Sequence, residues 1–469
     1  TLGLRVVLGI WIGRDPLVND AQLARGLELA RSHGDVVDLL VVGNEVLLRR
    51  ELAPEALADL LARAKQESAV PVAYADVWEF WLRHGPVLRG HVDVVAAHIL
   101  PYWEDRPVAV ADAVDHVAAI AAELGAAFDP LPVYVAETGW PAAGRQRGPA
   151  VPGGLEQARF VRELLARQAA LPLPFNLIEG FDQPWKRALE GAMGGAWGLF
   201  DAQGQARVRL SGPVVPDPHG WRLPVAAALG GLAGLAWAAW RSRPQGSTGA
   251  AGILWRALAL LLGGAGCAAL VPLQWEALVL WSRSPLEWGL GALTMLLALL
   301  CGLAAAARLA DYLGVAGAAA RPGVVDAWGG GTALGVRLLA SAQLCFLFVT
   351  AVDALGLVFD PRYRPLDWPT LAAPTVLLLA LALLGDRLGA GAREERLLAA
   401  VCAGCAPLVA VQEGLANTQA LLYVALLLAL AVATLLPHRA ALAPGPTSLR
   451  CRTRANPASS TAGAAKAVE

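Results

Sequence analysis

Two glutamates each follow a short apolar run and stand in a tight, glycine-containing context. Glu45 ends the segment VVGNE at 41–45, and Glu137 opens the segment ETGWP at 137–141. Cleavage of a glycosidic bond needs such a pair, because one carboxyl protonates the leaving oxygen while the other attacks the anomeric carbon or activates water. We therefore interpret Glu45 as the acid/base and Glu137 as the nucleophile of a retaining reaction. A lone glutamate in such a place is usually just solvated.

The two carboxyl groups are expected to influence each other. An ionised Glu137 should keep Glu45 protonated until catalysis, because two nearby carboxylates resist double ionisation. Asn44, directly before Glu45, suits a hydrogen bond to a sugar hydroxyl beside the reacting carbon.

Strand-like runs alternate with amphipathic helical stretches around these glutamates. The strand-like runs are 4–12, 36–42, 70–75, 92–100, 131–136 and 175–181, and the helical stretches are 20–32, 54–65, 108–124 and 154–170. This alternation predicts a parallel α/β fold, and six such units are two short of a (β/α)8 TIM barrel, in which catalytic residues lie at the strand ends. A doubly wound sheet is the alternative, but the chain has no glycine-rich phosphate turn after a strand.

Several motifs resemble glycoside hydrolase family 17, the β-1,3-glucanases and related glucanosyltransferases. Residues 42–45 and 137–141 look like that family's acid/base and nucleophile motifs. Pro101-Tyr102 resembles part of its sixth strand, and 181–186, Glu190 and 197–200 resemble its closing segment. The resemblance covers roughly residues 1–205 and is closest to a bacterial branch whose members often carry membrane spans. It implies cleavage of β-1,3-glucan with transfer to water or to a sugar acceptor, and neither a cofactor nor a metal ion is expected.

The chain departs from this family pattern at a few positions. His98 and Leu100 stand where the family usually has Asn and Tyr, and Gln183 stands where an acidic residue is usual. The first two barrel strands are also absent. We therefore expect an N-terminally truncated barrel that does not close, in a chain that is a fragment, with an unpaired edge at the strand 4–12.

Further side chains are expected to contact the sugar. Aromatic rings at strand ends can stack on a pyranose face, and polar side chains near them can bind its hydroxyls. The predicted substrate-binding residues are Asn44, Tyr102, Trp103, Trp140, Gln183, Trp185, Lys186 and Glu190. The alternatives are that the rings pack the barrel rim and that Lys186 and Glu190 pair with each other.

The second half of the chain has the composition of a membrane protein. Of all 469 residues, 56% are hydrophobic and 16% are charged, whereas soluble chains carry about 25% charged residues. Apolar runs near the ~20 residues needed to cross a bilayer begin after Gly220, at 223–240, 253–273, 286–307, 334–358, 370–385, 397–412 and 418–436. We predict a partial barrel over 1–210, a linker over 211–222, a membrane domain of about seven helices over 223–437, and a disordered cytoplasmic tail over 438–469. The alternative for the weak fifth or sixth run is a re-entrant or interfacial segment.

Arginine placement predicts the orientation. Arginines gather in alternate loops and in the tail, at 241 and 243, at 308 and 321, at 387, 393 and 396, and at 439, 450, 452 and 454. The positive-inside rule puts these segments in the cytoplasm, which places the first half in the periplasm or outside the cell, anchored to the inner membrane. Asp353 and Glu413 lie near predicted span ends, and an interfacial position is expected for both.

The net charge and the cysteine positions limit the kinds of partner and function that we expect. The net charge of −1 gives no indication of nucleic acid binding, which leaves a β-glucan and the lipid bilayer as expected partners. Cys402 and Cys405 form a CxxC in an apolar run, and we interpret them as buried structural residues. A non-catalytic glucan-binding barrel coupled to membrane export or anchoring is the alternative function, and a membrane glycosyltransferase would need nucleotide-sugar motifs that are absent.

Overall fold

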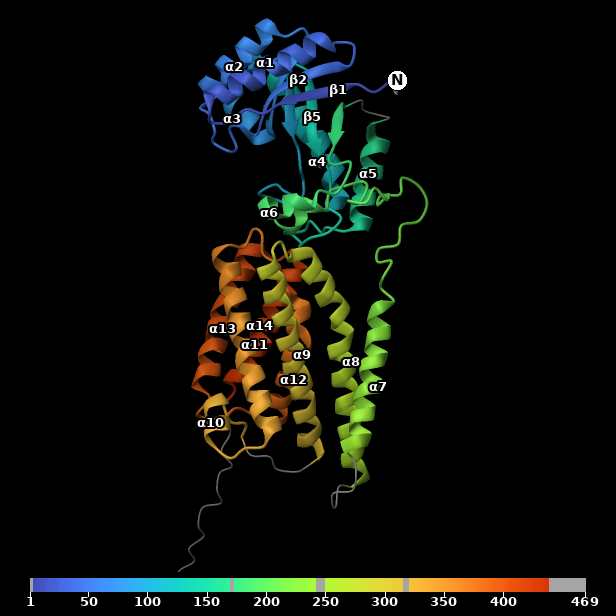
Figure 1. Ribbon diagram of the computed structural model, residues 1–469, viewed down its shortest axis with the longest axis vertical. Helices are drawn as coiled ribbons and strands as arrows, with labels where there is room; N and C mark the ends of the chain where they lie inside the picture. The colour runs from blue at the N-terminus through green and yellow to red at the C-terminus, as the bar shows by residue number, and fades with distance from the viewer. Residues whose placement is uncertain (1–2, 169–172, 242–248, 315–319, 438–469) are drawn as a thin grey trace, which may run out of the picture.

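The computed structural model describes residues 3–168, 173–241, 249–314 and 320–437. Its first half is one parallel sheet whose strands pair in the order of the sequence (Figure 1). The strands are β1 (Val6–Ile10), β2 (Val37–Asn44), β3 (Val72–Val77), β4 (Val94–His98), β5 (Val133–Thr138) and β6 (Phe175–Leu177). This sheet has the arrangement of a partial TIM-like barrel, as the alternation of apolar runs predicts.

Helices connect consecutive strands of the sheet. They are α1 (Pro16–Ser32), α2 (Pro54–Glu67), α3 (Trp78–Leu88), α4 (Val110–Phe128) and α5 (Gly154–Gln168). The sequence pattern predicts four of them. It does not show α3, because this helix follows β3 without a loop and contains Pro86, a residue that normally signals a helix end.

The two faces of the sheet carry different residues. Large side chains on one face pack against the helices, and Trp81 of α3 and Leu61 of α2 are fully buried there. The other face is built mainly from small side chains and valines, namely Leu39, Val41, Ala73, Ala75, Ala96 and Ala136. Among the described strands β1 pairs only with β2, and its Val6 and Val7 are about two-fifths exposed. The expected open edge is therefore confirmed.

A bundle of helices forms the second half. It contains α7 (Arg222–Arg241), α8 (Ala250–Trp281), α9 (Pro285–Gly314), α10 (Val324–Gly329), α11 (Leu334–Phe359), α12 (Trp368–Leu384), α13 (Arg393–Glu413) and α14 (Thr418–Leu435). Every predicted span coincides with a helix, although α8 and α9 are longer than predicted. In the described part of the chain, five helices are long and apolar enough to cross a membrane: α7, α8, α9, α11 and α14.

The two weaker predicted spans do not meet that criterion. Helix α12 is apolar but has only 17 residues. Helix α13 has 21 residues, but its first turn carries Arg393, Glu394, Glu395 and Arg396. Both helices pack inside the bundle, where Leu378 of α12 and Ala399 of α13 are fully buried. Cys402 and Cys405 are buried and unpaired in α13, and the predicted tail 438–469 lies outside the described residues.

The sheet domain sits on one end of the bundle, with the short helix α6 (Arg187–Glu190) between them (Figure 1). Arg145, in the loop after β5, forms a buried ion pair with Glu413 at the end of α13. The neighbouring Gln146 accepts a 2.9 Å hydrogen bond at its carbonyl from Asn417. Buried and hydrogen-bonded contacts of this kind fix the two halves against each other.

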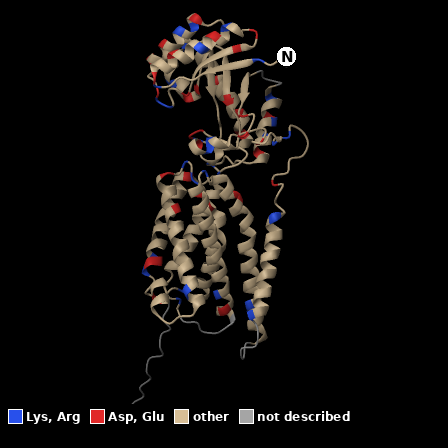
Figure 2. Cartoon of the chain, viewed as in Figure 1, with Lys and Arg blue, Asp and Glu red and all other residues tan. Residues whose placement is uncertain are grey.

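The opposite end of the bundle carries its own charged contacts. Arg241 at the end of α7 pairs with Asp311 of α9 at 3.0 Å, and Arg308 of α9 pairs with Asp386 at 2.9 Å. Charged side chains lie mainly in the sheet domain and at the ends of the bundle, and few lie along the middle of its helices (Figure 2). Of the arginines identified in the sequence, the described residues Arg241, Arg308 and Arg321 therefore lie at the end far from the sheet (Figure 1).

Candidate active site

The turn after β2 gives Glu45 its position. Gly43 has a φ of 87° and Glu45 a φ of 53°, a region that residues with a side chain rarely adopt. A Cβ on Gly43 would lie 2.8 Å from Val46 Cγ2, so glycine is required there. The Glu45 amide donates a 2.8 Å hydrogen bond to the Ala75 carbonyl of β3. Unfavourable backbone held in place by its surroundings is typical of functional sites.

Two buried side chains of β3 hold this turn. The Tyr74 hydroxyl accepts a 3.0 Å hydrogen bond from the Leu47 amide and donates to the Asp76 carboxylate. Asp76 also accepts from the Val77 amide at 2.8 Å. Burial raises the pKa of Asp76 above its ordinary value. The turn that carries Glu45 is therefore supported by a polar network that no sequence motif indicates.

His98, at the end of β4, links the two glutamates. Its Nδ1 lies 3.2 Å from Glu45 Oε1, and its Nε2 lies 3.7 Å from Glu137 Oε1. The imidazole is 1% exposed. Parallel pairing places His98 directly beside Glu137 in the register of β4 and β5. The two carboxylates therefore approach opposite nitrogens of one ring and face a common space.

The charges of these three groups are coupled. Burial of His98 disfavours its charged form, but the nearby Glu137 and Glu45 carboxylates outweigh burial and raise the pKa of His98. Burial also opposes ionisation of Glu45, yet the hydrogen bond from His98 and the positive charges of His98 and Arg49 together outweigh it and lower the pKa of Glu45. Burial raises the pKa of Glu137, and the His98 charge offsets this only in part.

This order is the reverse of the expected one, in which Glu137 is ionised and Glu45 holds the proton. The expectation considered only the two carboxylates and omitted the cation between them. Because His98 hydrogen-bonds Glu45 and not Glu137, the imidazolium stabilises the ionised form of Glu45 more strongly. The imidazolium form of His98 therefore carries a proton within hydrogen-bond distance of Glu45.

A third carboxylate that sequence reasoning missed lies beside this pair. Glu179 follows β6, is 9% exposed, and pairs through Oε2 with Lys186 Nζ at 2.7 Å. Gln183 donates to the same oxygen at 3.1 Å. Lys186 thus forms its ion pair with Glu179, while its charge also favours the ionised form of Glu190. The signal that identified the other glutamates, an acidic residue after an apolar strand, was also present at Glu179.

Glu190, expected to bind sugar, belongs to the same charged cluster. Its side chain is half-buried, and burial raises its pKa, with the Lys186 ammonium partly opposing this and the Glu179, Glu137 and Glu45 carboxylates adding to it. Asn44 ends β2 next to Glu45 and is half-buried. The structure thus brings both residues to the edge of the sheet where the catalytic candidates lie.

The four predicted aromatic residues separate into three environments. Tyr102 and Trp140 are buried, at 0% and 1% exposure, so neither ring has a face open to a sugar in this structure. Trp103 is half-buried and lies parallel to Trp197, with 6.4 Å between ring centres. Trp185 is 62% exposed, and its ring nitrogen donates to Gln183 at 2.8 Å.

The burial of Tyr102 and Trp140 corrects their expected role. The Tyr102 hydroxyl donates a 2.6 Å hydrogen bond to the Arg145 carbonyl, and Trp140 Nε1 donates to the Val151 carbonyl at 2.9 Å. Both rings thereby hold the loop after β5, which packs onto the helical bundle. Proximity to Glu137 in sequence does not reveal this, because the loop's path depends on the second domain.

Comparison with known proteins supports a carbohydrate-active domain. Residues 1–198 match the model of the BtgE/BtgC glycoside hydrolase domain. A probable beta-glucosidase btgE of Aspergillus fumigatus is 30% identical over 206 residues, which are 43% of this chain and 36% of that protein. A glucan 1,3-beta-glucosidase of Arthroderma benhamiae is 28% identical over 218 residues, 43% of this chain and 69% of that protein.

A solved structure is also similar. The crystal structure of the glycoside hydrolase family 17 beta-1,3-glucanosyltransferase from Rhizomucor miehei is 27% identical, with a TM-score of 0.40 over 45% of this chain and 77% of that one. The chain spans only about a third of the length of the btgE relatives. The match to the family model lies in the sheet domain. Residues 1–198 therefore match a glycoside hydrolase domain and carry paired glutamates at the ends of parallel strands.

Proposed function

We propose that this protein cleaves β-1,3-glucan with retention of configuration and transfers the released glucosyl group to water or to a sugar acceptor. The observation that carries the proposal is the convergence of Glu45 and Glu137 on one imidazole, at 3.2 and 3.7 Å, within a glycoside hydrolase domain. The similarity to a glucan 1,3-beta-glucosidase supports the β-1,3 linkage.

The proposed reaction has two steps. Glu137 attacks the anomeric carbon while Glu45 protonates the departing oxygen, which forms a glycosyl ester on Glu137 and releases the rest of the chain. Glu45 then removes a proton from water or an acceptor hydroxyl, whose oxygen displaces Glu137. His98 supplies the proton that Glu45 needs at the start, because its Nδ1 is in hydrogen-bond contact with Glu45. Asn44 and Trp103 are proposed to orient the sugar.

The helical bundle is proposed to anchor this domain in a bacterial inner membrane. Five of the described helices have the length and composition to cross a bilayer, and α12 and α13 complete a proposed seven-helix domain over 223–437. The arginine-rich end is proposed to lie in the cytoplasm by the positive-inside rule. The glycosidase domain, on the other end, would then meet glucan in the periplasm or outside the cell.

Replacement of the proposed nucleophile tests this function. Glu137→Ala in the full chain should abolish cleavage of a laminari-oligosaccharide. Added azide should restore turnover of an activated glucoside and give a glycosyl azide of inverted configuration, because a small anion enters the space of the missing carboxylate. Near-normal turnover of Glu137→Ala without azide would refute the assignment. If the unaltered protein bound the oligosaccharide but never cleaved it, the non-catalytic glucan-binding alternative would hold instead.

A further inference from the structure

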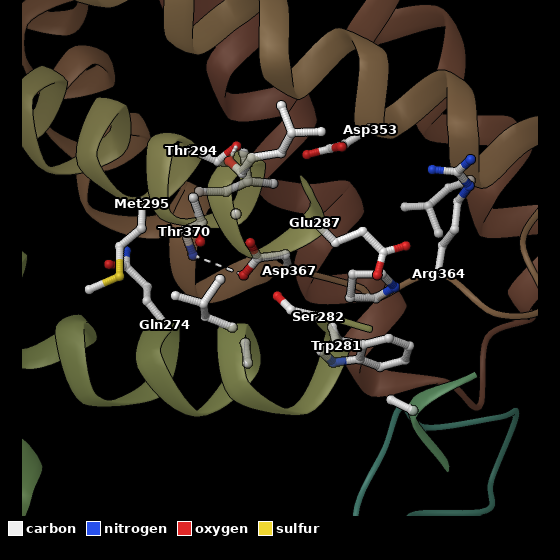
Figure 3. Close-up of a pocket in the computed structure, with 18 of the residues that line it drawn as sticks. Gln274, Trp281, Ser282, Glu287, Thr294, Met295, Asp353, Arg364, Asp367 and Thr370 are labelled. Carbon is white, nitrogen blue, oxygen red and sulfur yellow. Dashed lines mark hydrogen bonds between the residues drawn. The ribbon is translucent and has the colours of Figure 1, made fainter. Parts of the chain in front are cut away.

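A cavity of about 440 Å³ lies in the helical bundle at the end that faces the glycosidase domain. Its wall includes side chains of α8, α9, α11 and α14, of the loop before α12, and Ala192 of the glycosidase domain. Figure 3 shows Glu287, Asp353 and Asp367 around this space, with Trp281 at the side nearest the glycosidase domain. The volume falls within the range of about 300–1,000 Å³ typical of small-molecule sites.

Two buried polar groups in the cavity wall have unmet hydrogen-bonding capacity. Tyr423 is 2% exposed, and within the described part of the chain its hydroxyl makes no hydrogen bond. Gln274 is 6% exposed, and its amide nitrogen donates to the Pro369 carbonyl while its Oε1 is similarly unpartnered. Buried polar groups without partners are costly, so their presence in a cavity wall points to a polar ligand.

The charges of the wall indicate which polar ligand fits. The lining contains two arginines and four acidic residues, namely Arg283, Arg364, Glu287, Asp353, Asp360 and Asp367. The excess of negative charge disfavours phosphates and other anions. A metal ion does not fit either, because among the described residues no three His, Cys, Asp or Glu side chains are grouped closely enough to hold one. A neutral polyhydroxyl compound fits both kinds of charge in the wall, because its hydroxyls donate hydrogen bonds to carboxylates and accept them from arginines.

Sugar rings match both the polar and the aromatic parts of the wall. Carboxylates and the Gln274 amide oxygen accept hydrogen bonds from hydroxyls, and the Tyr423 hydroxyl both donates and accepts. Trp281 and Tyr363 also line the cavity, and flat rings of this kind cover the apolar face of a pyranose. The composition is therefore that of a saccharide site.

The cavity adjoins the proposed catalytic site through one short segment. Glu190 faces the charged cluster of Glu45 and Glu137, whereas Ala192, two residues later, lines the cavity. Tyr363 of the cavity wall also packs against Trp103, with 6.5 Å between ring centres. Tyr363 of the bundle thus lines the cavity and also contacts the glycosidase domain.

We propose that this cavity is a second saccharide-binding site, which holds a neutral sugar end beside the glycosidase domain. This inference rests on the proposed function, because the sugar is taken to be the substrate or acceptor of that reaction. The sugar belongs either to a free glucan end or to the head group of a glycolipid, which would enter from the surrounding membrane.

Photocrosslinking in nanodiscs tests the site directly. The probe is laminaribiose carrying a diazirine, and the protein is the full chain with Glu137→Gln, which prevents turnover. Mass spectrometry should find label on peptides of α8, α9 or α11 as well as in the glycosidase domain. Asp353→Ala should reduce the bundle label at least tenfold, and Tyr423→Phe, which removes only a hydroxyl, should reduce it severalfold. Glu276→Ala is the matched control, because Glu276 is an exposed carboxylate of α8 outside the cavity wall.

The possible results distinguish failure of the cavity site from failure of the proposed enzymatic function. Label in the glycosidase domain alone, with cleavage by the unaltered protein, would overturn the cavity site and leave the function standing. Bundle label without cleavage would keep the saccharide site and refute the enzyme. Equal loss of label in Asp353→Ala and Glu276→Ala would overturn the site, with label in the glycosidase domain showing that each variant is folded. Nanodiscs containing a monoglucosyl lipid then distinguish the two sources of the sugar. If this lipid competes with the probe, the site binds a glycolipid head group. If it does not compete, the site binds a free glucan end.

Discussion

Replacement of His98 by asparagine tests whether this imidazole controls the pKa values of Glu45 and Glu137. Asparagine is the residue that the resemblance to family 17 gives at this position. The change removes the hydrogen bond that His98 donates to Glu45 at 3.2 Å and the positive charge that lies 3.7 Å from Glu137. Both carboxylates thereby lose a partner that favours their ionised form, so the pKa of each should rise.

The size of the change in the pKa of Glu45 follows from the hydrogen bond that is lost. A hydrogen bond to a charged group contributes about 1.5–3 kcal/mol, and about 1.4 kcal/mol corresponds to a tenfold change in an equilibrium constant. At a given pH the ratio of ionised to protonated Glu45 should therefore fall by about tenfold to a hundredfold. Glu137 should change less, because its contact with His98 is longer than a hydrogen bond.

The pH dependence of kcat/KM on a laminari-oligosaccharide reports both groups in the free enzyme. In the unaltered protein the basic limb follows loss of the proton that His98 supplies to Glu45, and the acidic limb follows protonation of Glu137. In His98→Asn the acidic limb should move to higher pH, because Glu137 loses the neighbouring positive charge, and the basic limb should move to lower pH, because Glu45 must then hold the proton itself. His116→Asn is the control, because His116 pairs with Glu104 at 2.8 Å and contacts neither catalytic glutamate. A lower maximum with unmoved limbs would refute the reasoning.

The same substitution should change stability with a definite sign. The pKa of His98 is raised in the folded protein, so its contribution is fully present below the unfolded-state value of about 6.5 and is lost as the pH rises through the folded-state pKa. The difference in unfolding temperature between the unaltered protein and His98→Asn should therefore be largest below pH 6.5 and shrink at higher pH. A difference that grew with pH would contradict a charged His98.

Three further predictions concern the acid, its turn and the membrane orientation. Glu45→Ala should lose cleavage of natural glucan by at least a hundredfold but largely spare activated aryl glucosides, whose leaving group needs no proton; equal losses in glycosylation-limited assays would contradict the acid role. Gly43→Ala should destabilise the domain by about 1–3 kcal/mol in thermal unfolding, because Gly43 has a positive φ. Gly9→Ala in β1 is the control and should change stability little, since a Cβ there meets no atom within 4 Å. A reporter active only outside the cytoplasm should be active after Phe200 and silent after Arg241, and activity at both points would overturn the orientation.

Local patterns in the sequence were sufficient for the elements and for the two principal glutamates. Runs of apolar residues separated by amphipathic stretches predicted all six strands and four of the five helices between them. Because parallel strands present their carboxyl ends at one edge, the sequence alone predicts that Glu45 and Glu137 lie close together. Long apolar runs likewise coincided with all seven helices longer than 16 residues in the described part of the second half.

Tertiary structure decided which side chains surround those glutamates and in what state of charge. His98 acquires its place between Glu45 and Glu137 only because β4 brings it there, and its cation then reverses the expected protonation order. Trp140 is buried between Tyr102 and Phe160, and Arg145 in the same loop contacts the bundle, more than 200 positions away in the chain. Asp353, expected at a membrane interface, lines a cavity shared by five helices. Sequence periodicity carries information about neighbours within one element, whereas these features depend on contacts between distant elements, which periodicity does not encode.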